Sequence, residues 1–136
     1  MHTLKDVKFI NFKTFNKKKE LLTAYTGNDN VPFNLKRMFL TGNVQKDSLR
    51  GSHAHKKTSQ IFICLYGKIN IRCFDGKKTK VYKLTDQSLG IFIPPTIWYD
   101  TLYKGKNNSI MVLTDKKYLI NDYILTKEEY LKFRKI

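Results

Sequence analysis

Short apolar runs separated by turn-forming residues make up most of the chain. Ile61–Tyr66 is apolar throughout, which is typical of a strand buried on both faces. Ile69, Ile71 and Cys73 alternate with polar residues, which is typical of a half-buried strand. Further strands are expected near residues 7–9, 21–25, 36–41, 81–84, 91–93, 97–103 and 109–114. Because turn signals recur at intervals of roughly eight to twelve residues, the pattern predicts an all-β fold, an antiparallel sandwich or barrel.

The pattern changes period only at the end of the chain. Thr126 followed by Glu129 fits the start of a helix, and Tyr130, Leu131 and Phe133 could form one apolar helix face. No linker, low-complexity tract or repeat interrupts the sequence. We therefore expect one domain, residues 1–136, with a short C-terminal helix.

The strong positive charge raises the question of nucleic acid. The 136 residues carry a net charge of +15, but only four of the 26 basic residues are arginine, the side chain preferred for bidentate contacts to phosphates and bases. The tightest cluster, Lys17–Lys19, contains no aromatic residue and leads into Glu20. The sequence thus favours a positive surface that attracts small anions, including a nucleotide diphosphate, over nucleic-acid binding.

The apolar runs and the two cysteines indicate where the protein is located and whether its thiols are reactive. No apolar run approaches the roughly 20 residues of a membrane helix, and Met1–Asp6 lacks the apolar centre of a signal peptide. We expect no membrane partner and a cytoplasmic protein. Cys64 and Cys73 lie in separate apolar runs and do not form a CxxC pair, so we interpret both as core thiols.

The most distinctive stretch is Arg50–Gln60, which reads RGSHAHKKTSQ. His53 and His55 are two residues apart at the entry to a strand, so their side chains are expected on the same face. Two such imidazoles could bind a metal, transfer protons or simply face solvent. A metal is disfavoured, because Gln60 stands where a carboxylate ligand would be needed and no later strand offers a histidine. The prediction is no metal.

Nearby residues favour proton transfer in a pocket. Arg50 adjoins the pair, Gln60 can lie on the same sheet face, and Trp98 with Tyr99 could supply an aromatic wall. Histidine suits proton transfer near neutral pH. Each neighbour also has a purely structural interpretation: core or rim for the aromatic pair, a satisfied backbone group for Gln60, and an ion pair for Arg50.

Three motifs together resemble the sugar-nucleotide 3,4-ketoisomerases. They are Arg50–Lys56 (RGSHAHK), Gly90–Trp98 (GIFIPPTIW) and the tail Asn121–Phe133. The resemblance implies a small cupin, a jelly-roll barrel, that forms a homodimer with exchanged N-terminal strands and needs no metal or organic cofactor. It also implies action on dTDP-4-keto-6-deoxyglucose. The resulting dTDP-3-keto-6-deoxyhexose would go to an aminotransferase that makes 3-amino-3,6-dideoxy sugars for surface glycans such as lipopolysaccharide O-antigen.

The resemblance and the chemistry together suggest roles for the site residues. The expected catalytic pair is His53, for the carbon-bound proton, and His55, for protons on the two oxygens. Arg50 or Tyr99 could stabilise an enediolate. The residues expected to bind substrate are Arg50, Gln60, Trp98, Tyr99, Arg37 and Lys18.

The chain departs from the family pattern in its N-terminal half. Lys18 stands where the family has an arginine in a DxRG-like turn, and Phe39 stands where a tyrosine is common. Two alternatives also stay open. One is a related sugar-nucleotide epimerase, although no clear set of His with a partner Asp and a Tyr is visible in the sequence. The other is a non-catalytic cupin that binds a sugar or nucleotide.

Overall fold

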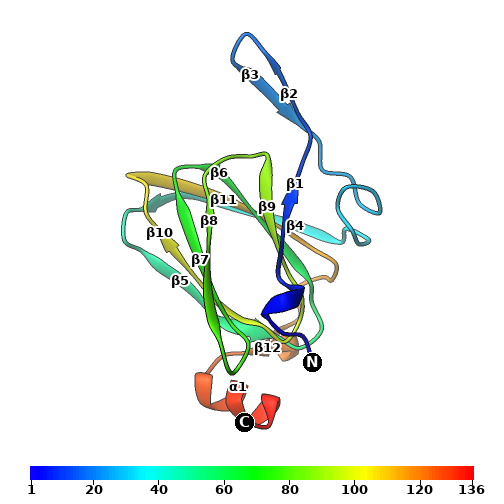
Figure 1. Cartoon of the computed structure of the whole chain (residues 1–136), viewed down its shortest axis with the longest axis vertical. Helices are drawn as coiled ribbons and strands as arrows, with labels where there is room; N and C mark the ends of the chain where they lie inside the picture. The colour runs from blue at the N-terminus through cyan, green and yellow to red at the C-terminus, as the bar shows by residue number, and fades with distance from the viewer.

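Two five-stranded antiparallel sheets face each other in the computed structural model, which describes residues 1–136 (Figure 1). The first sheet has the order β1 (Lys8–Asn11), β9 (Leu89–Ile93), β6 (Gln60–Tyr66), β11 (Asn107–Thr114) and β4 (Arg37–Gln45). The second has the order β12 (Tyr123–Ile124), β5 (Leu49–His55), β10 (Trp98–Tyr103), β7 (Ile69–Phe74) and β8 (Thr79–Leu84).

The remaining elements lie outside this sandwich. A hairpin of β2 (Thr14–Lys17) and β3 (Glu20–Thr23) projects away from the body, as Figure 1 shows. The 3-10 helix η1 (Leu4–Asp6) precedes β1, and a second, η2 (Ile120–Asp122), precedes β12. Helix α1 (Lys127–Arg134) follows at the end of the molecule opposite the hairpin. None of these helices has both the length and the apolar character that crossing a bilayer requires.

The main core fills the space between the two sheets. Ile69, Ile71 and Cys73 of β7 are fully buried there, as their alternation predicted. Strand β6 contributes to two cores, because Phe62 and Cys64 face the sandwich interior while Ile61 and Ile63 belong to a second cluster on the outer face. Burial on both faces therefore explains the apolar residues 61–64, whereas Leu65 and Tyr66 at the end of the strand are exposed. Both cysteines are buried and free, in agreement with the interpretation as core thiols.

The all-β antiparallel fold with a C-terminal helix is confirmed, whereas the closed barrel is not. The strands form two separate sheets, and no ladder joins an edge of one sheet to an edge of the other. Packing of side chains between the sheets replaces closure by hydrogen bonds. The structure is the sandwich alternative of the sequence-based prediction.

The C-terminal helix closes the end of the sandwich near the N-terminus. Thr126 caps it, since its hydroxyl accepts a hydrogen bond from the Glu129 amide at 3.1 Å. Arg134 donates from one guanidinium nitrogen to the carbonyls of His2 at 2.6 Å and Thr96 at 2.9 Å. The Tyr130 hydroxyl also donates to the Thr96 carbonyl, at 2.8 Å. The chain ends are thus fixed to the turn between β9 and β10.

Candidate active site

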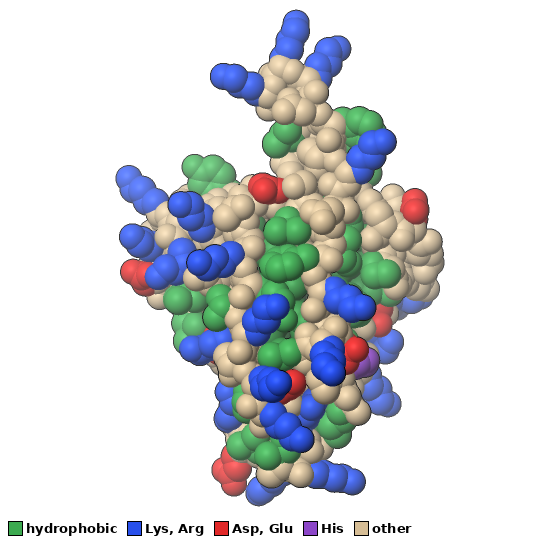
Figure 2. Space-filling model, in the orientation of Figure 1, with side chains coloured by type: hydrophobic (Ala, Val, Ile, Leu, Met, Phe, Trp, Pro, Cys, Tyr) green, Lys and Arg blue, Asp and Glu red, His purple; other side chains and the backbone are tan.

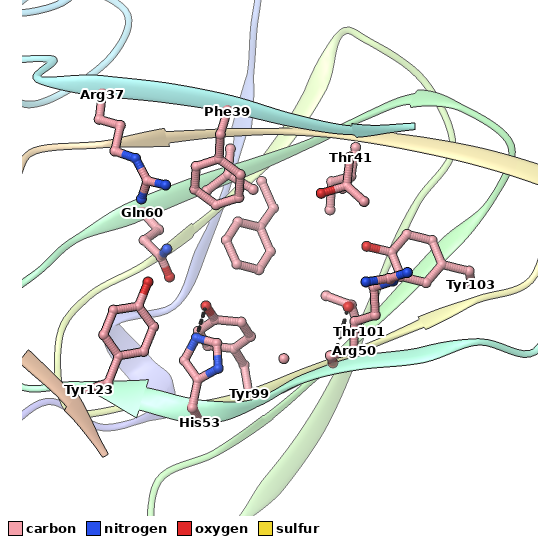
Figure 3. A pocket seen from close by; sticks show the side chains of 14 residues that line it. Arg37, Phe39, Thr41, Arg50, His53, Gln60, Tyr99, Thr101, Tyr103 and Tyr123 are labelled. Atoms are coloured by element: carbon pink, nitrogen blue, oxygen red, sulfur yellow. Dashed lines mark hydrogen bonds between the residues drawn. The ribbon is translucent and has the colours of Figure 1, made fainter. Parts of the chain in front are cut away.

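A cavity of about 230 Å³ opens between the sheets and contains most of the predicted site residues (Figure 3). Fourteen residues from both sheets line it: Arg37, Phe39, Thr41, Arg50, Gly51, His53, Gln60, Phe62, Tyr99, Thr101, Tyr103, Ile110, Val112 and Tyr123. Cavities for drug-sized ligands measure roughly 300–1,000 Å³. The size therefore suits the reacting part of a larger ligand.

A bulge in β5 positions the histidine motif. Tyr99 of β10 pairs with His53 and Asp100 pairs with Gly51, so Ser52 is an extra residue in β5. Gly51 and Ser52 both have positive φ, at 84° and 60°. A Cβ atom on Gly51 would lie 3.3 Å from the Tyr99 ring and 3.3 Å from the Asp100 Cα. Glycine is therefore needed both for the conformation and for the close approach of β10.

Beyond the bulge, His53 and His55 point to the same side, as predicted. Their ring centroids are 5.2 Å apart. The Tyr123 ring packs against both imidazoles, with centroid distances of 4.9 Å to His53 and 4.3 Å to His55. Tyr99 lies 4.9 Å from His53 on another side. The pair is therefore enclosed by aromatic side chains.

His53 faces the cavity and is held by Tyr99. Its Nε2 atom lies 2.8 Å from the Tyr99 hydroxyl, the contact marked in Figure 3. Burial, followed by the charge of His55, lowers the pKa of His53 to about 4. Burial also raises the pKa of Tyr99 far above its usual value. Near neutral pH the contact therefore joins a neutral imidazole to a neutral phenol.

His55 is buried more deeply and is paired with a carboxylate. Its Nδ1 lies 3.1 Å from Oδ2 of Asp122, and its Nε2 is buried without a hydrogen-bond partner. Burial lowers the pKa of His55, although the hydrogen bond and the charge of Asp122 oppose the shift. For Asp122, burial raises the pKa, but hydrogen bonds from Thr58, Lys57 and His55 outweigh it and hold the pKa below its usual value.

His55 does not line the main cavity. It borders a small adjoining cavity of about 10 Å³, and Arg37, Gln60 and Tyr123 line both spaces. These three side chains therefore form the boundary between His55 and the main cavity. Figure 3 shows them together at one end of the site.

Arginines supply positive charge at both ends of the cavity. Arg37 stacks over Phe39, with its guanidinium carbon 4.6 Å from the ring centroid, and lies 5.3 Å from the Tyr118 ring. Arg50 lies at the opposite end near Tyr103, as Figure 3 shows. Neither arginine forms a salt bridge within the chain. Their uncompensated charge favours an anionic ligand.

Two predicted binding residues lie outside this cavity. Trp98 points to the other face of β10 from Tyr99 and packs with Ala54, Ile124 and Tyr130. This follows from the alternation of strand side chains, so Trp98 is a core residue and not part of the cavity wall. Lys18 is exposed in the turn of the projecting hairpin, where Figure 2 shows a cluster of basic side chains.

The sequence analysis missed the partner of His55. Asp122 is 67 residues away in the chain and reaches the site because β12 pairs with the end of β5. It lies within the tail motif, but no local pattern marks it as a site residue. The expectation that the chain lacks a His with a partner Asp and a Tyr is wrong, because His55, Asp122 and Tyr123 are together. No group of three or more His, Cys, Asp or Glu side chains is arranged to hold a metal ion.

Comparison with known proteins places this chain in a family. The family model described as "FdtA: WxcM-like, C-terminal" matches residues 5–135. A TDP-4-oxo-6-deoxy-alpha-D-glucose-3,4-oxoisomerase from Aneurinibacillus thermoaerophilus is 30% identical over 126 residues, covering 93% of this chain and 91% of that protein.

Two solved structures extend the comparison to the fold. The sugar 3,4-ketoisomerase QdtA from Thermoanaerobacterium thermosaccharolyticum, solved in complex with TDP, superposes with a TM-score of 0.93 at 34% identity over 98% of this chain and 97% of that one. A His-to-Asn variant of QdtA was solved with TDP-4-keto-6-deoxyglucose. The TDP-fucose-3,4-ketoisomerase WlaRA from Campylobacter jejuni gives a TM-score of 0.87 at 31% identity, over 95% and 96% of the two chains. The chain therefore belongs to the FdtA, WxcM-like C-terminal family, the family of the sugar-nucleotide 3,4-ketoisomerases.

Proposed function

We propose that this enzyme converts TDP-4-keto-6-deoxyglucose to a TDP-3-keto-6-deoxyhexose. The observation that carries the proposal is the histidine pair: His53 lines the cavity, and His55 beside it is held at Nδ1 by the Asp122 carboxylate and has no partner at Nε2. A 3,4-ketoisomerase needs two proton-transfer groups beside one sugar ring, and this pair meets that need. The relatives named above act in the same reaction class.

The reaction is an internal redox exchange between neighbouring carbons. The C3 proton is acidic because it lies next to the C4 ketone. Its removal, with protonation of the C4 oxygen, gives an enediol. Return of a proton to C4 and loss of the proton from the C3 hydroxyl leave a ketone at C3. C3 is oxidised, C4 is reduced, and no external electron acceptor is required.

The pairing with Asp122 favours His55 as the base for the carbon-bound proton, the reverse of the sequence-based assignment, although His53 is the histidine that lines the main cavity. An imidazole that takes this proton becomes cationic, and the Asp122 carboxylate stabilises that cation. His53 has no carboxylate partner to stabilise an imidazolium, because its ring contact is the Tyr99 hydroxyl. His53 and Tyr99 instead form a hydroxyl–imidazole pair suited to moving a proton between the two sugar oxygens. Movement of Gln60 or Tyr123 would open the route from the main cavity to His55.

Cavity residues supply the remaining contacts to substrate. Arg37 and Arg50 would bind anionic parts of the nucleotide sugar or the enediolate. Gln60 and Tyr99 would donate hydrogen bonds to sugar oxygens. We propose no metal or organic cofactor, because proton transfer through an enediol needs neither.

The proposed enzyme is a homodimer with exchanged N-terminal strands. The projecting hairpin exposes Phe15, Leu21 and Leu22, and the edge strand β4 exposes Met38 and Leu40. Apolar surface of this kind supports association. In such a dimer Lys18 would act at the partner's site. Light scattering should then give a dimer mass at micromolar concentration, and Leu22→Asp should shift it toward the monomer. A monomer mass for the unaltered chain would contradict the proposal.

The chemistry also sets the metabolic context. A 3-keto sugar is the substrate that an aminotransferase needs to make a 3-amino-3,6-dideoxy sugar. We propose a cytoplasmic role in supplying such sugars for surface glycans, including lipopolysaccharide O-antigen.

One assay separates ketoisomerase from its rivals. The enzyme is incubated with TDP-4-keto-6-deoxyglucose in D2O, and the C3 and C4 protons are followed by NMR. Ketoisomerase activity gives a new 3-keto sugar. The epimerase alternative, which the His55–Asp122–Tyr123 set favours, gives deuterium exchange with the 4-ketone retained. A non-catalytic binder gives neither signal.

A further inference from the structure

The carboxylate behind His55 is held by three donors. Asp122 accepts hydrogen bonds from the Lys57 amide at 2.7 Å, the Thr58 hydroxyl at 2.5 Å and Nδ1 of His55 at 3.1 Å. Both Asp122 and His55 are almost fully buried, with 7% and 5% of their surface exposed. An ionised carboxylate accepts hydrogen bonds and donates none. Its contact with Nδ1 therefore requires a hydrogen on Nδ1.

This requirement fixes the state of the other ring nitrogen. In a neutral imidazole only one nitrogen carries hydrogen. With the hydrogen on Nδ1, the lone pair is on Nε2, the buried atom that has no partner in the chain. Buried polar atoms are nearly always paired with a hydrogen-bond partner. An unpaired Nε2 acceptor next to the cavity is therefore expected if this atom accepts a proton from the substrate.

We propose that Asp122 is a positioning residue for the ketoisomerase reaction: it fixes His55 in the tautomer that presents Nε2 as proton acceptor and stabilises the imidazolium formed when the proton arrives. The proposal rests on the proposed function for its kinetic part only. The tautomer belongs to the resting protein and can be measured without substrate.

Other charged groups around His55 are few. Arg37 of β4 lowers the pKa of His55, and Asp115, in the segment after β11, raises it slightly. His53 of β5 and Tyr123 of β12 pack against its ring. Only Asp122 forms a hydrogen bond to the imidazole ring of His55. Removal of the charge of Asp122 should therefore change the pKa and the tautomer of His55 more than removal of one charge from any of these neighbours.

Asp115 offers a matched control. Its carboxylate accepts a hydrogen bond from the Ser59 amide at 2.9 Å, as that of Asp122 does from Lys57, but it does not contact His55. Asp122→Asn and Asp115→Asn remove the same charge from the same end of the sandwich. An amide at position 122 keeps one acceptor oxygen for three donors, so it cannot satisfy both His55 and the backbone.

The first measurement is two-dimensional ¹H–¹⁵N NMR of the histidine rings in the ligand-free protein. The unaltered enzyme and Asp115→Asn should show His55 with hydrogen on Nδ1 and a bare Nε2. Asp122→Asn should lose this pattern. The second measurement is the pH profile of kcat and KM. Asp122→Asn should lower kcat by at least about tenfold with KM changed less than about threefold, because the orienting carboxylate acts on the base and not on binding.

The direction in which the acid limb of the pH profile moves shows whether Asp122 positions His55 or has only a structural role. Loss of the carboxylate lowers the pKa of His55, so the acid limb of the profile should move to lower pH in Asp122→Asn. Thr58→Val acts in the opposite direction: with one donor fewer on Oδ2, the carboxylate interacts more strongly with His55, and the acid limb should move to higher pH. This second variant also keeps the test available should Asp122→Asn fail to fold.

The outcomes are distinguishable. An unchanged His55 tautomer in Asp122→Asn, or an acid limb that moves equally in Asp115→Asn, would overturn the positioning role. Absence of turnover by the unaltered enzyme would contradict the proposed function, and the ring spectra alone would then decide the role of Asp122.

Discussion

The hydroxyl of Tyr99 lies 2.8 Å from Nε2 of His53, and this contact joins β10 to β5 inside the cavity. It divides the histidine pair into two different groups, since His53 faces a phenol and His55 faces a carboxylate. Because one pair of identical side chains has two environments, it can perform two different proton transfers. The predictions below test this division.

Replacement of the histidines should separate the two proton transfers. Both His53→Asn and His55→Asn should lower turnover on the order of a hundredfold or more, because each removes a general acid–base group. They should differ in D2O: His55→Asn should stop exchange of the C3 proton of the substrate, whereas His53→Asn should retain measurable exchange. NMR of the substrate checks both. Full activity in both variants would contradict the assignment of the site, and C3 exchange retained only in His55→Asn would reverse the two roles.

Removal of the Tyr99 hydroxyl should act through His53. Tyr99→Phe keeps the ring, which is 5% exposed and packs edge-on against Phe62 at 4.9 Å, so the core should remain intact. We expect kcat to fall by about tenfold to a hundredfold as the hydroxyl–imidazole pair is lost. Tyr103→Phe is the matched control, because it removes a hydroxyl from the same strand and cavity without contacting His53. Equal losses in both variants would show that the Tyr99 hydroxyl has no special relation to His53.

The depressed pKa of His53 should appear in the stability of the protein. The folded state holds this group at a pKa of about 4, against 6.5 for the free side chain. Below pH 6.5 the unfolded chain therefore binds a proton that the folded chain excludes. The contribution of His53 to stability is complete above pH 6.5 and is lost progressively as the pH falls toward 4. Urea unfolding between pH 7 and pH 4.5 should show a declining midpoint, and His53→Asn should reduce the slope. A slope unaffected by the substitution would contradict the shift.

The sequence predicts the histidine pair and the sheet structure because both depend on local alternation. His53 and His55 lie on one side for the same reason that Ile69 and Ile71 are buried together. The pairing of His55 with Asp122 depends instead on β12 joining β5, and a two-residue strand leaves no recognisable pattern. Trp98 and Tyr99 were both expected in the site although adjacent strand residues face opposite ways. Since both are aromatic, their types do not reveal which one faces the cavity.

In the N-terminal segment, too, the sequence predicts individual strands but not how they are placed relative to distant segments. The sequence predicted the strand pattern around 21–25 but not that β2 and β3 form a hairpin standing away from the two sheets, as in Figure 1. Where Lys18 acts therefore depends on association with a second chain, which no pattern within one sequence determines. The motif residues that pack within one sheet were predictable, and those that depend on contacts between distant segments were not.

The bulge at Gly51 should be sensitive to a single methyl group. Gly51→Ala places a Cβ atom 3.3 Å from both the Tyr99 ring and the Asp100 Cα, at a φ of 84°. We expect a loss of about 1–3 kcal/mol in the free energy of unfolding, typical of a strained left-handed position. Activity should fall as well, because the ring that moves is the partner of His53. Gly42→Ala is the control, since its Cβ would meet only the Ser109 hydroxyl at 3.5 Å. Equal melting temperatures for the two variants would contradict this account of the bulge.

Chelation should leave turnover unchanged if the two imidazoles act without a metal ion. His53 and His55 have no third ligand in a metal-binding arrangement, and Asp122 already accepts hydrogen bonds from three donors. A divalent ion at Nε2 of His53 would have to displace the Tyr99 hydroxyl that lies 2.8 Å from it. We therefore expect the same kcat before and after dialysis against EDTA, and no stimulation by added Zn²⁺, Mn²⁺ or Ni²⁺. Loss of activity on chelation, with recovery when one of these ions is added, would contradict proton transfer by two metal-free imidazoles. It would indicate a metal-assisted mechanism instead.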